Sequence, residues 1–530
     1  SAGSGTPFNT FFLSLDTSSH VYGAVVEIRS HEATLSGDVT GTTSIKLHSS
    51  EDAWPTVAAS VEDSKKSSLT IVSTCHVQCS GCEIDIEVDG QLHMGGTTTS
   101  MTLSVQAGED ADVLSTSTLQ ATGSTLDVES VRASVGIYGT IDSTPNDAIV
   151  TVTAAVNITV SSSDEGIECS GNGCIVVLVA GSNIILGSSA WISSSGYLSG
   201  VNITAVDTVS LDSTSYVDAS YIRVIADSMS MAGGTELNTN GRGYSEGEGS
   251  GKPGVHTFTN TGGTYDAQSG SGGGAGYGGD GGNSCHKHAY SSYPAGGSSY
   301  GSATWPVDFG SGGGKVAYNK GFPTGRGGAG GGRVHVTVDG VLSIDGTITA
   351  NGASGTLYDG SNSYDMSGGG GSGGSILIEA GSMSGAGSLL ANGGGITTYN
   401  GGSGSGGRIA VHLDEDLPST STMPTLTTTV EAFGSYTSSA QTNCGGGAAG
   451  TIFYRYGNWT VLVVDNNANP AADSTRTALP LELTSATDGQ AAAYEGSVVW
   501  TVIKDRSKLE MRGSAGSGTP FNTFFLSLDT

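Results

Sequence analysis

Short alternating apolar runs recur along this chain, and their spacing limits the fold more than any other feature. Runs that begin at Leu126, Val150, Ile175, Val201 and Ile222 give successive spacings of 24, 25, 26 and 21 residues. In most of these periods a second apolar run and a third apolar position follow. One coil of a parallel β-helix needs three short strands, each laid on a strand of the preceding coil. The spacing therefore predicts an all-β fold, a right-handed parallel β-helix.

The same runs predict which side chains fill the core. Side chains alternate across a strand, so every second residue points inward and successive coils bury one continuous column. An antiparallel sandwich is the alternative, but it favours two-residue hairpin turns at regular spacing, and none recur here. The predicted inward column consists of Val150, Val152, Ile175, Val177, Val201, Ile203, Ile222 and Val224.

The chain also carries one long exact repeat. Residues 1–17 read SAGSGTPFNTFFLSLDT, and residues 514–530 read the same, which places the two copies 513 positions apart (514 minus 1). An artificial duplication is the alternative, but such additions seldom contain a strand-like sequence such as FFLSL. The repeat predicts a tandem array with a 513-residue period, in which both copies have the same conformation.

Charge and hydropathy exclude several classes of partner. Lys and Arg together number 20 against 49 Asp and Glu, so the net charge is −29. Nucleic acids and anionic membranes both require Lys and Arg, so neither is expected as a partner. No apolar run approaches the roughly 20 residues that cross a bilayer, so no membrane span is predicted.

Three Asn-x-Ser/Thr sequons suggest an extracellular protein that carries glycans. They lie at Asn157, Asn202 and Asn458, and seven cysteines accompany them. Clustered cysteines and a low Lys content point in the same direction, because disulfides persist outside the reducing cytoplasm. The sequence therefore predicts glycosylation at these sites and an extracellular or cell-surface location.

The cysteines leave two interpretations open. Cys75, Cys79 and Cys82 lie beside His76 and have the spacing of either zinc ligands or disulfide partners. An oxidising compartment favours disulfides. Cys169 and Cys174 enclose a short Gly-containing loop and are predicted to form a local disulfide. Cys285 lies among histidines but has no second ligand cluster in the sequence nearby, so no metal and no cofactor are predicted.

Residues 241–332 interrupt the strand pattern with Gly, Ser and Tyr. A flexible linker is one interpretation. The aromatic residues favour another, in which the region is an ordered excursion that packs on the outer wall of a β-helix and serves assembly. The predicted organisation is thus β-helix coils in 1–240, the excursion in 241–332, further coils in 333–513, and the next repeat from 514 to 530. The assembly candidates are Tyr290, Tyr293, Tyr300, Trp305 and Phe309.

Beyond the excursion, strands return behind glycine doublets. These doublets precede Arg333, Ser375 and Arg408, and the dipeptides Asn351-Gly352 and Asn392-Gly393 end later strands. Glycine allows both positive φ and close backbone approach. We expect the doublets to supply positive φ at corners, and the Asn-Gly pairs to occupy left-handed corners.

These motifs resemble a known family. The runs GGGRVHVTVDGVLSIDGTITANG, GGGSGGSILIEAGSMSGAGSLLANGGG, GGSGSGGRIAVHL and GGGAAGTIFY are similar to glycine-rich extracellular parallel β-helix repeat proteins. Relatives occur on bacterial surfaces and in giant surface proteins of algae, protists and plants. In that family a segment like WTVLVVDNNANPAADSTRTALP commonly follows, as it does here at 459–480. The resemblance covers 241–480 and implies architecture and an extracellular setting, with no shared catalytic residues.

The predicted function is structural: one repeat of a stiff filament, hair or sheath such as a mastigoneme shaft. Its partners are identical repeats of the same chain and neighbouring copies. One alternative is an adhesin or carbohydrate-binding module, and another is a polysaccharide-active enzyme. The acidic runs 109–112 and 414–416 could bind sugar or Ca²⁺. Exposed loop acids need no such role, and Lys and Arg are sparse, so no enzyme is predicted.

Overall fold

The computed structural model describes most of the chain and divides it into two compact units. Unit 1 is Ser1–Glu236 and unit 2 is Leu237–Thr530. The described residues are all-β and contain no α-helix. They are 8–15, 20–36, 38–49, 68–71, 75–115, 117–161, 166–254, 271–284, 294–316, 326–356, 367–396, 401–414, 428–436, 445–457, 459–467, 469, 477–480, 498–504, 509–512 and 523–528.

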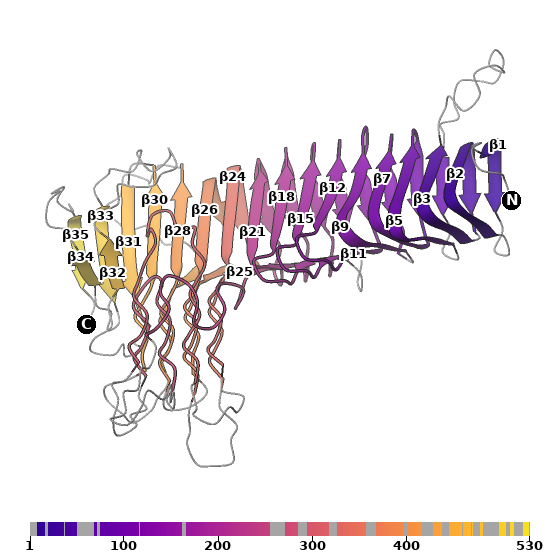
Figure 1. The fold of residues 1–530 in the computed structure, drawn as a ribbon. Helices are drawn as coiled ribbons and strands as arrows, with labels where there is room; N and C mark the ends of the chain where they lie inside the picture. The colour runs from indigo at the N-terminus through magenta and orange to yellow at the C-terminus, as the bar shows by residue number, and fades with distance from the viewer. Residues whose placement is uncertain are drawn as a thin grey trace, which may run out of the picture. The chain divides into compact units, whose positions relative to one another are not determined.

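Unit 1 is a parallel β-helix with three stacks of strands (Figure 1). Three long strands turn a corner and contribute one half to the first stack and the other half to the second. They are β5 (His76–Val88), β7 (Thr97–Ala107) and β9 (Thr118–Ser130). At the beginning of the unit, β1 (Phe8–Leu15), β2 (His20–Leu35) and β3 (Asp38–Ser49) pair in parallel.

Separate short strands continue each stack, and every pair among them is parallel. The first stack continues with β11 (Thr140–Ser143), β14 (Gly166–Cys169), β17 (Trp191–Ser194) and β20 (Tyr216–Ala219). The second continues with β12 (Ile149–Ala154), β15 (Ile175–Ala180), β18 (Gly200–Ala205) and β21 (Tyr221–Ala226). The third contains β4 (Ser68–Ile71), β6 (Gln91–Met94), β8 (Ala111–Val113), β10 (Val135–Ile137), β13 (Ile158–Val160), β16 (Ile184–Leu186), β19 (Thr208–Leu211) and β22 (Ser228–Met231).

This arrangement confirms the predicted fold class, but β15 corrects the predicted core. Val176 pairs with Val150 and Val201, and is fully buried. Ile175 and Val177 were predicted to point inward, but both are half-buried and lie on the outer face. The sequence IVVLVA is apolar on both faces, so alternation cannot set its register, and a slip of one residue exchanges the faces.

The other six residues of the predicted column are buried as expected. Their exposed fractions lie between 0% and 1%, for Val150, Val152, Val201, Ile203, Ile222 and Val224. Leu178 takes the place predicted for Val177, between Val152 and Ile203. The inward column is therefore continuous through four successive coils.

Two disulfides lie at the corner between the first and second stacks. Cys79–Cys82 spans the register shift inside β5, and Cys169–Cys174 spans the turn from β14 to β15. Their Cα–Cα distances are 5.5 and 5.9 Å. Cys75, also a disulfide candidate, does not join either pair. It is a buried thiol, and burial together with the charge of Asp38 raises its pKa to about 12.

In unit 2 two parallel stacks carry the glycine-rich sequences (Figure 1). One contains β24 (Arg333–Ile344), β26 (Ser375–Ser384), β28 (Arg408–Leu413) and β30 (Thr451–Tyr456). The other contains β25 (Thr347–Thr349), β27 (Ser388–Leu390) and β29 (Thr429–Glu431). β23 (Glu236–Asn238) spans the boundary between the units.

The last part of unit 2 departs once from parallel order. β31 (Trp459–Asp465) pairs antiparallel with β30, although 333–513 was expected to form coils only. Parallel pairing resumes with β33 (Val498–Lys504) on β31 and β35 (Thr523–Leu528) on β33. A separate parallel pair joins β32 (Thr477–Pro480) to β34 (Leu509–Arg512).

The described parts of the two identical terminal segments have the same conformation. Residues 10–15 are strand within β1, and their counterparts 523–528 form β35. Each copy pairs in parallel with a strand one coil away in sequence, as Phe8 with Ile28 and Val498 with Thr523.

Candidate assembly site on the outer face of β24 to β30

The candidate site begins with the glycine-rich segments of unit 2, here called the glycine-rich block. In Figure 1 these segments run side by side away from β24, β26, β28 and β30. They have no regular strand or helix assignment, yet most of their residues are buried. The block comprises residues 239–254, 271–284, 294–316, 326–332, 350–356, 367–374, 391–396, 401–407, 432–436 and 445–450.

Hydrogen bonds from residues 368–374 repeat every third residue. Successive backbone N–H groups donate to three neighbouring segments in rotation, at 2.7–3.0 Å. The acceptor carbonyls, in order from Gly368 to Gly374, belong to Thr356, Gly314, Gly402, Ala353, Ser311, Ser405 and Ala350. A threefold helix of the polyproline II type turns its N–H groups in three directions and makes no internal hydrogen bonds. Residues 368–374 therefore form a polyglycine helix of this type with three hydrogen-bonded neighbours.

A second run shows the same rotation. From Gly402 to Gly407 the N–H groups donate to residues of 272–275, 445–448 and 391–394 in turn. The acceptors are Gly272, Gly445, Gly394, Ala275, Ala448 and Ala391. Backbone hydrogen bonds in three directions thus hold the block together, where unit 1 relies on an apolar core.

Close backbone approach explains the glycine content. A Cβ at Gly371 would lie 2.0 Å from the carbonyl oxygen of Ala329, and one at Gly369 would lie 1.8 Å from that of Gly273. Real Cβ atoms essentially never come within 3.0 Å of another heavy atom in this way. Any other residue at these positions would force the neighbouring helices apart.

The expected corner geometry is wrong for these glycines. None of the glycines in 367–374 or 401–407 has a positive φ, and neither do Asn351 and Asn392. The asparagines instead form a ladder between coils, in which each side-chain oxygen accepts a backbone N–H of the next coil. Asn392 N–H donates to Asn351 Oδ1 at 2.6 Å, and Phe433 N–H donates to Asn392 Oδ1 at 2.7 Å.

The block covers an apolar outer surface on the sheet. Leu377, Ala410 and Phe453 lie in register on β26, β28 and β30, and their exposed fractions are 0%, 0% and 3%. Trp305, from the excursion, packs against this cluster. The sequence predicted that the excursion packs on an outer wall, with Trp305 among the candidates, but it did not identify Leu377, Ala410 and Phe453 as that wall. Continuous apolar runs such as ILI and IAV were the available signal, since strands buried on both faces lose alternation.

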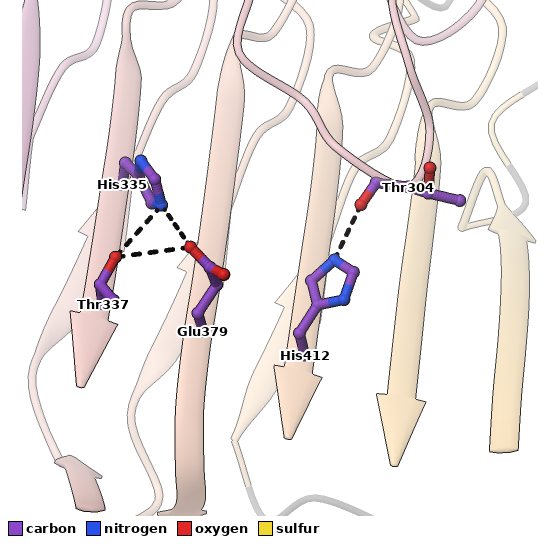
Figure 2. A network of polar contacts seen from close by, with 5 residues as sticks. All are labelled: Thr304, His335, Thr337, Glu379 and His412. Carbon is purple, nitrogen blue, oxygen red and sulfur yellow. Dashed lines mark hydrogen bonds and ion pairs between the residues drawn. The ribbon is translucent and has the colours of Figure 1, made fainter. Parts of the chain in front are cut away.

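Two histidines flank Trp305 on the same face. Its ring lies 5.4 Å from the His412 ring and 6.3 Å from the His335 ring, centroid to centroid. His412 Nε2 donates to the carbonyl oxygen of Thr304 at 2.8 Å, as Figure 2 shows. Burial lowers the pKa of His412 to about 4, so the ring is neutral near pH 7. His412 therefore holds the Thr304–Trp305 segment against β28.

His335 forms an ion pair with the next strand. Its Nε2 lies 2.8 Å from Glu379 Oε1, and Thr337 Oγ1 lies 3.3 Å from the same nitrogen (Figure 2). Burial opposes ionisation of Glu379, but the hydrogen bond and charge of His335 outweigh it, so the pKa of Glu379 lies below its ordinary value. A nucleophile–base–acid relay requires the hydroxyl and the carboxylate on opposite ring nitrogens. Here both contact Nε2, so this cluster lacks relay geometry.

Arg408 is the polar anchor of the block. The side chain is fully buried, and it donates from Nε to Tyr300 O at 2.9 Å and from Nη1 to Thr451 Oγ1 at 3.0 Å. The guanidinium also lies 5.6 Å from the centre of the Tyr277 ring. Burial lowers its pKa, while the nearby Tyr277 and Asp308 oppose that shift. Arg408 therefore ties two segments of the block to β28 and β30.

The described aromatic candidates all pack within unit 2. Tyr300 lies 4.7 Å from the fully buried Tyr277, centroid to centroid, and its hydroxyl lies 2.8 Å from Ser311 Oγ. Phe309 makes an edge contact with Tyr244 and lies under the Arg333 guanidinium, at 5.1 Å. Tyr290 and Tyr293 lie outside the described residues. The described excursion is therefore packed against its own unit.

The other candidate residues lie apart from this site. Asn157 Oδ1 accepts a hydrogen bond from the side-chain amide of Asn183 at 3.0 Å, and Asn202 lies on the outer face of β18. Asn458 is outside the described residues, as are Cys285 and Cys444. Asp112 pairs with His93 at 3.1 Å and Asp414 pairs with Arg455 at 3.3 Å. Among described residues no His, Cys, Asp and Glu group could hold a metal ion.

The sequence was compared with known families, proteins and structures. No protein-family model, curated protein or solved structure matches this sequence. Within the described part of the chain, no helix is long and apolar enough to cross a membrane. The two disulfides are typical of proteins that leave the reducing cytoplasm.

Proposed function

We propose that this chain is one structural unit of a giant extracellular tandem-repeat protein that forms a stiff filament, hair or sheath, as in a mastigoneme shaft. The observation that carries the proposal is the 17-residue identity between 1–17 and 514–530, together with the strand conformation of both copies. The role is mechanical, with identical repeats and neighbouring copies as partners and no catalytic step.

Stiffness follows from the way the backbone is paired. Parallel stacks place hydrogen bonds between successive coils, so each coil is held by its two neighbours. Disulfides at a repeated corner resist unwinding in an oxidising medium. The polyglycine helices form a second hydrogen-bonded layer beside the coils, and Arg408 and Trp305 attach it to the sheet.

Electron microscopy tests the proposal directly. Native material and a purified chain with several successive 513-residue periods should both give unbranched filaments of constant width. Discrete particles from both preparations would reject the filament function. The control is a chain of equal length in which the order of the coils within each period is scrambled. It should not form filaments.

One aromatic pair on the outer face of unit 1, half-buried Trp191 with exposed Tyr216, favours a second candidate, a carbohydrate-binding surface module. Trp191 and Tyr216 stack on the outer face of β17 and β20, with ring centroids 6.4 Å apart and an interplanar angle of 13°. Tyr216 is 41% exposed. Flat exposed rings suit the apolar faces of sugars. Glycan-array binding that is lost in Trp191→Ala with Tyr216→Ala, but kept when exposed Tyr138 is changed to Ala, would support this role.

A further inference from the structure

The repeated terminal strand is paired along two different sides in its two copies. In the first copy β1 pairs with β2, the strand that follows it in the chain. In the second copy β35 pairs with β33, the strand that precedes it. Among the described strands, β1 has no preceding neighbour and β35 has no following one. The two copies of one sequence therefore show the pairing of the same strand along each of its two edges.

The two sets of partners combine without conflict. Ser14 pairs with Thr34, and its counterpart Ser527 pairs with Val502. The flanking positions behave in the same way. Leu13 pairs with Ala33 while Leu526 pairs with Thr501, and Leu15 pairs with Leu35 while Leu528 pairs with Ile503. Each residue thus has one partner on each side, as in the interior of a parallel sheet.

Backbone geometry permits both pairings at once. Successive N–H and C=O groups of a parallel strand point alternately to the two neighbouring strands, so pairing along one side leaves the groups of the other side available. The sequence separations also fit, because Val498 to Thr523 spans 25 residues and Phe8 to Ile28 spans 20. These separations match the coil spacing in unit 1, such as 25 residues from Val176 to Val201.

We propose that the free side of β35 is the docking surface for the β2 strand of the following copy of this chain. The repeated segment then forms one shared strand between β33 of one repeat and β2 of the next. The helix crosses the repeat boundary without a break in register. This inference rests on the proposed tandem array and specifies how its units join. Thr34 is exposed while Ala33 and Leu35 are buried, which assigns the faces at the junction.

Hydrogen exchange compares the 530-residue chain with a chain of two successive periods (residues 1–513 followed by 1–530). Because 514–530 repeats 1–17, the measured peptide must begin within 505–513, which distinguishes the second segment from the first. In the shorter chain this peptide should protect about half of the amides of 523–528, those that face β33. In the longer chain the peptide that begins within 505–513 and continues past residue 17 of the following copy occurs only at the junction. It should protect nearly all amides of 523–528, with at least tenfold slower exchange for the newly paired amides. Unchanged protection would overturn the proposal. Full protection in the shorter chain that disappears on dilution would also overturn it, because the free side of β35 would then pair with the strand edge of any other molecule of the chain.

Cysteine pairs test the register at the same junction. Neighbouring parallel strands lie about 4.8 Å apart, within disulfide reach. In the two-period chain, Val502→Cys with Ser527→Cys should cross-link, and Ser527→Cys with Thr34→Cys of the following copy should cross-link equally well. The control, Ser527→Cys with Ala33→Cys of the following copy, is displaced by one residue and should not react. Peptide mass spectrometry identifies each bond, and failure of either predicted pair rejects the shared strand.

Electron microscopy of the same two-period chain separates this inference from the proposed function. Filaments without the predicted cross-links would reject the shared strand and leave the filament role standing. Both cross-links without filaments would support the shared strand and reject the filament role.

Discussion

At the scale of single residues, the glycines of the block act through the side chain that they lack. For the glycines in 368–374 and 401–407, the shortest distance from the ideal Cβ position is to a backbone oxygen, which cannot move aside as a flexible side chain would. Gly233, in contrast, has no heavy atom within 4 Å of its ideal Cβ position. The two kinds of glycine therefore predict opposite responses to the same substitution.

Gly371→Ala should destabilise the block by about 1–3 kcal/mol, because the added methyl overpacks a backbone contact. Gly233→Ala should be neutral or stabilise unit 1 by up to about 1 kcal/mol, because it restricts the unfolded chain. Urea unfolding of both variants gives the comparison. Equal effects would contradict the close-packed polyglycine helices.

Arg408→Ala should cost about 3–5 kcal/mol, because it leaves buried carbonyl groups of the block without their donor. Arg333 lies in the same register row, two strands away, and is only half-buried. Arg333→Ala should cost less than about 1 kcal/mol. Trypsin cleavage after Lys315 and Arg326 reports the loss of the block, and it should accelerate in the first variant alone.

At the scale of elements, β15 is the strand in which either face could have entered the core. Val176 is fully buried and its neighbour Val177 is half-buried on the outer face. Val176→Ala should therefore cost about 2–3 kcal/mol, through lost burial and a residual cavity. Val177→Ala should cost less than about 1 kcal/mol. Thermal unfolding measures both, and the reverse order would restore the register predicted from the sequence.

The segment that carries Trp305 should loosen in acid. His412 has an ordinary pKa of 6.5, which burial lowers to about 4 in the folded chain. The unfolded chain therefore binds a proton first as the pH falls. The stabilisation by neutral His412 is complete above about pH 6.5 and is lost towards pH 4, by on the order of 3 kcal/mol. The lowered pKa of Glu379 adds a further loss below its ordinary value of 4.5.

Unfolding free energy measured from pH 7 to pH 4 checks this prediction. His412→Gln keeps a side-chain N–H donor but does not titrate, so its stability should fall less over the same range. Exposed His76→Gln is the matched control and should follow the unmodified chain. Identical pH profiles for all three proteins would contradict the role given to His412.

At the scale of the whole molecule, the extracellular proposal makes a chemical prediction about native material. At least one of Asn157, Asn202 and Asn458 should carry glycan, and Cys169 should be joined to Cys174. Mass spectrometry of native peptides tests both. Three unmodified asparagines together with free thiols would place the protein in a reducing compartment.

How much of this could be read from the sequence depends on the range of the interactions. The strand period, the parallel fold class and the Cys169–Cys174 disulfide are local or nearly periodic features. The spacing of alternating runs such as Val150-Val152 and Val201-Ile203 predicted the period and the fold class, and the short Gly-containing loop predicted the disulfide. Alternation failed at β15, where both faces are apolar and only the neighbouring coils choose the register.

The tertiary structure alone decided the candidate site. A polyglycine helix has no side-chain pattern, and its hydrogen-bonded neighbours lie far away in the sequence. Ser372 N–H donates to Ser311, for example, and Gly373 N–H donates to Ser405. The anchoring of Arg408 and the covering of Leu377 by Trp305 likewise join residues distant in sequence. The sequence determined the coil and the identity of residues 1–17 with 514–530, because both are recurrences along the chain. Only the packed chain decided where the glycines gather, because that depends on which backbones approach closely enough to exclude a Cβ.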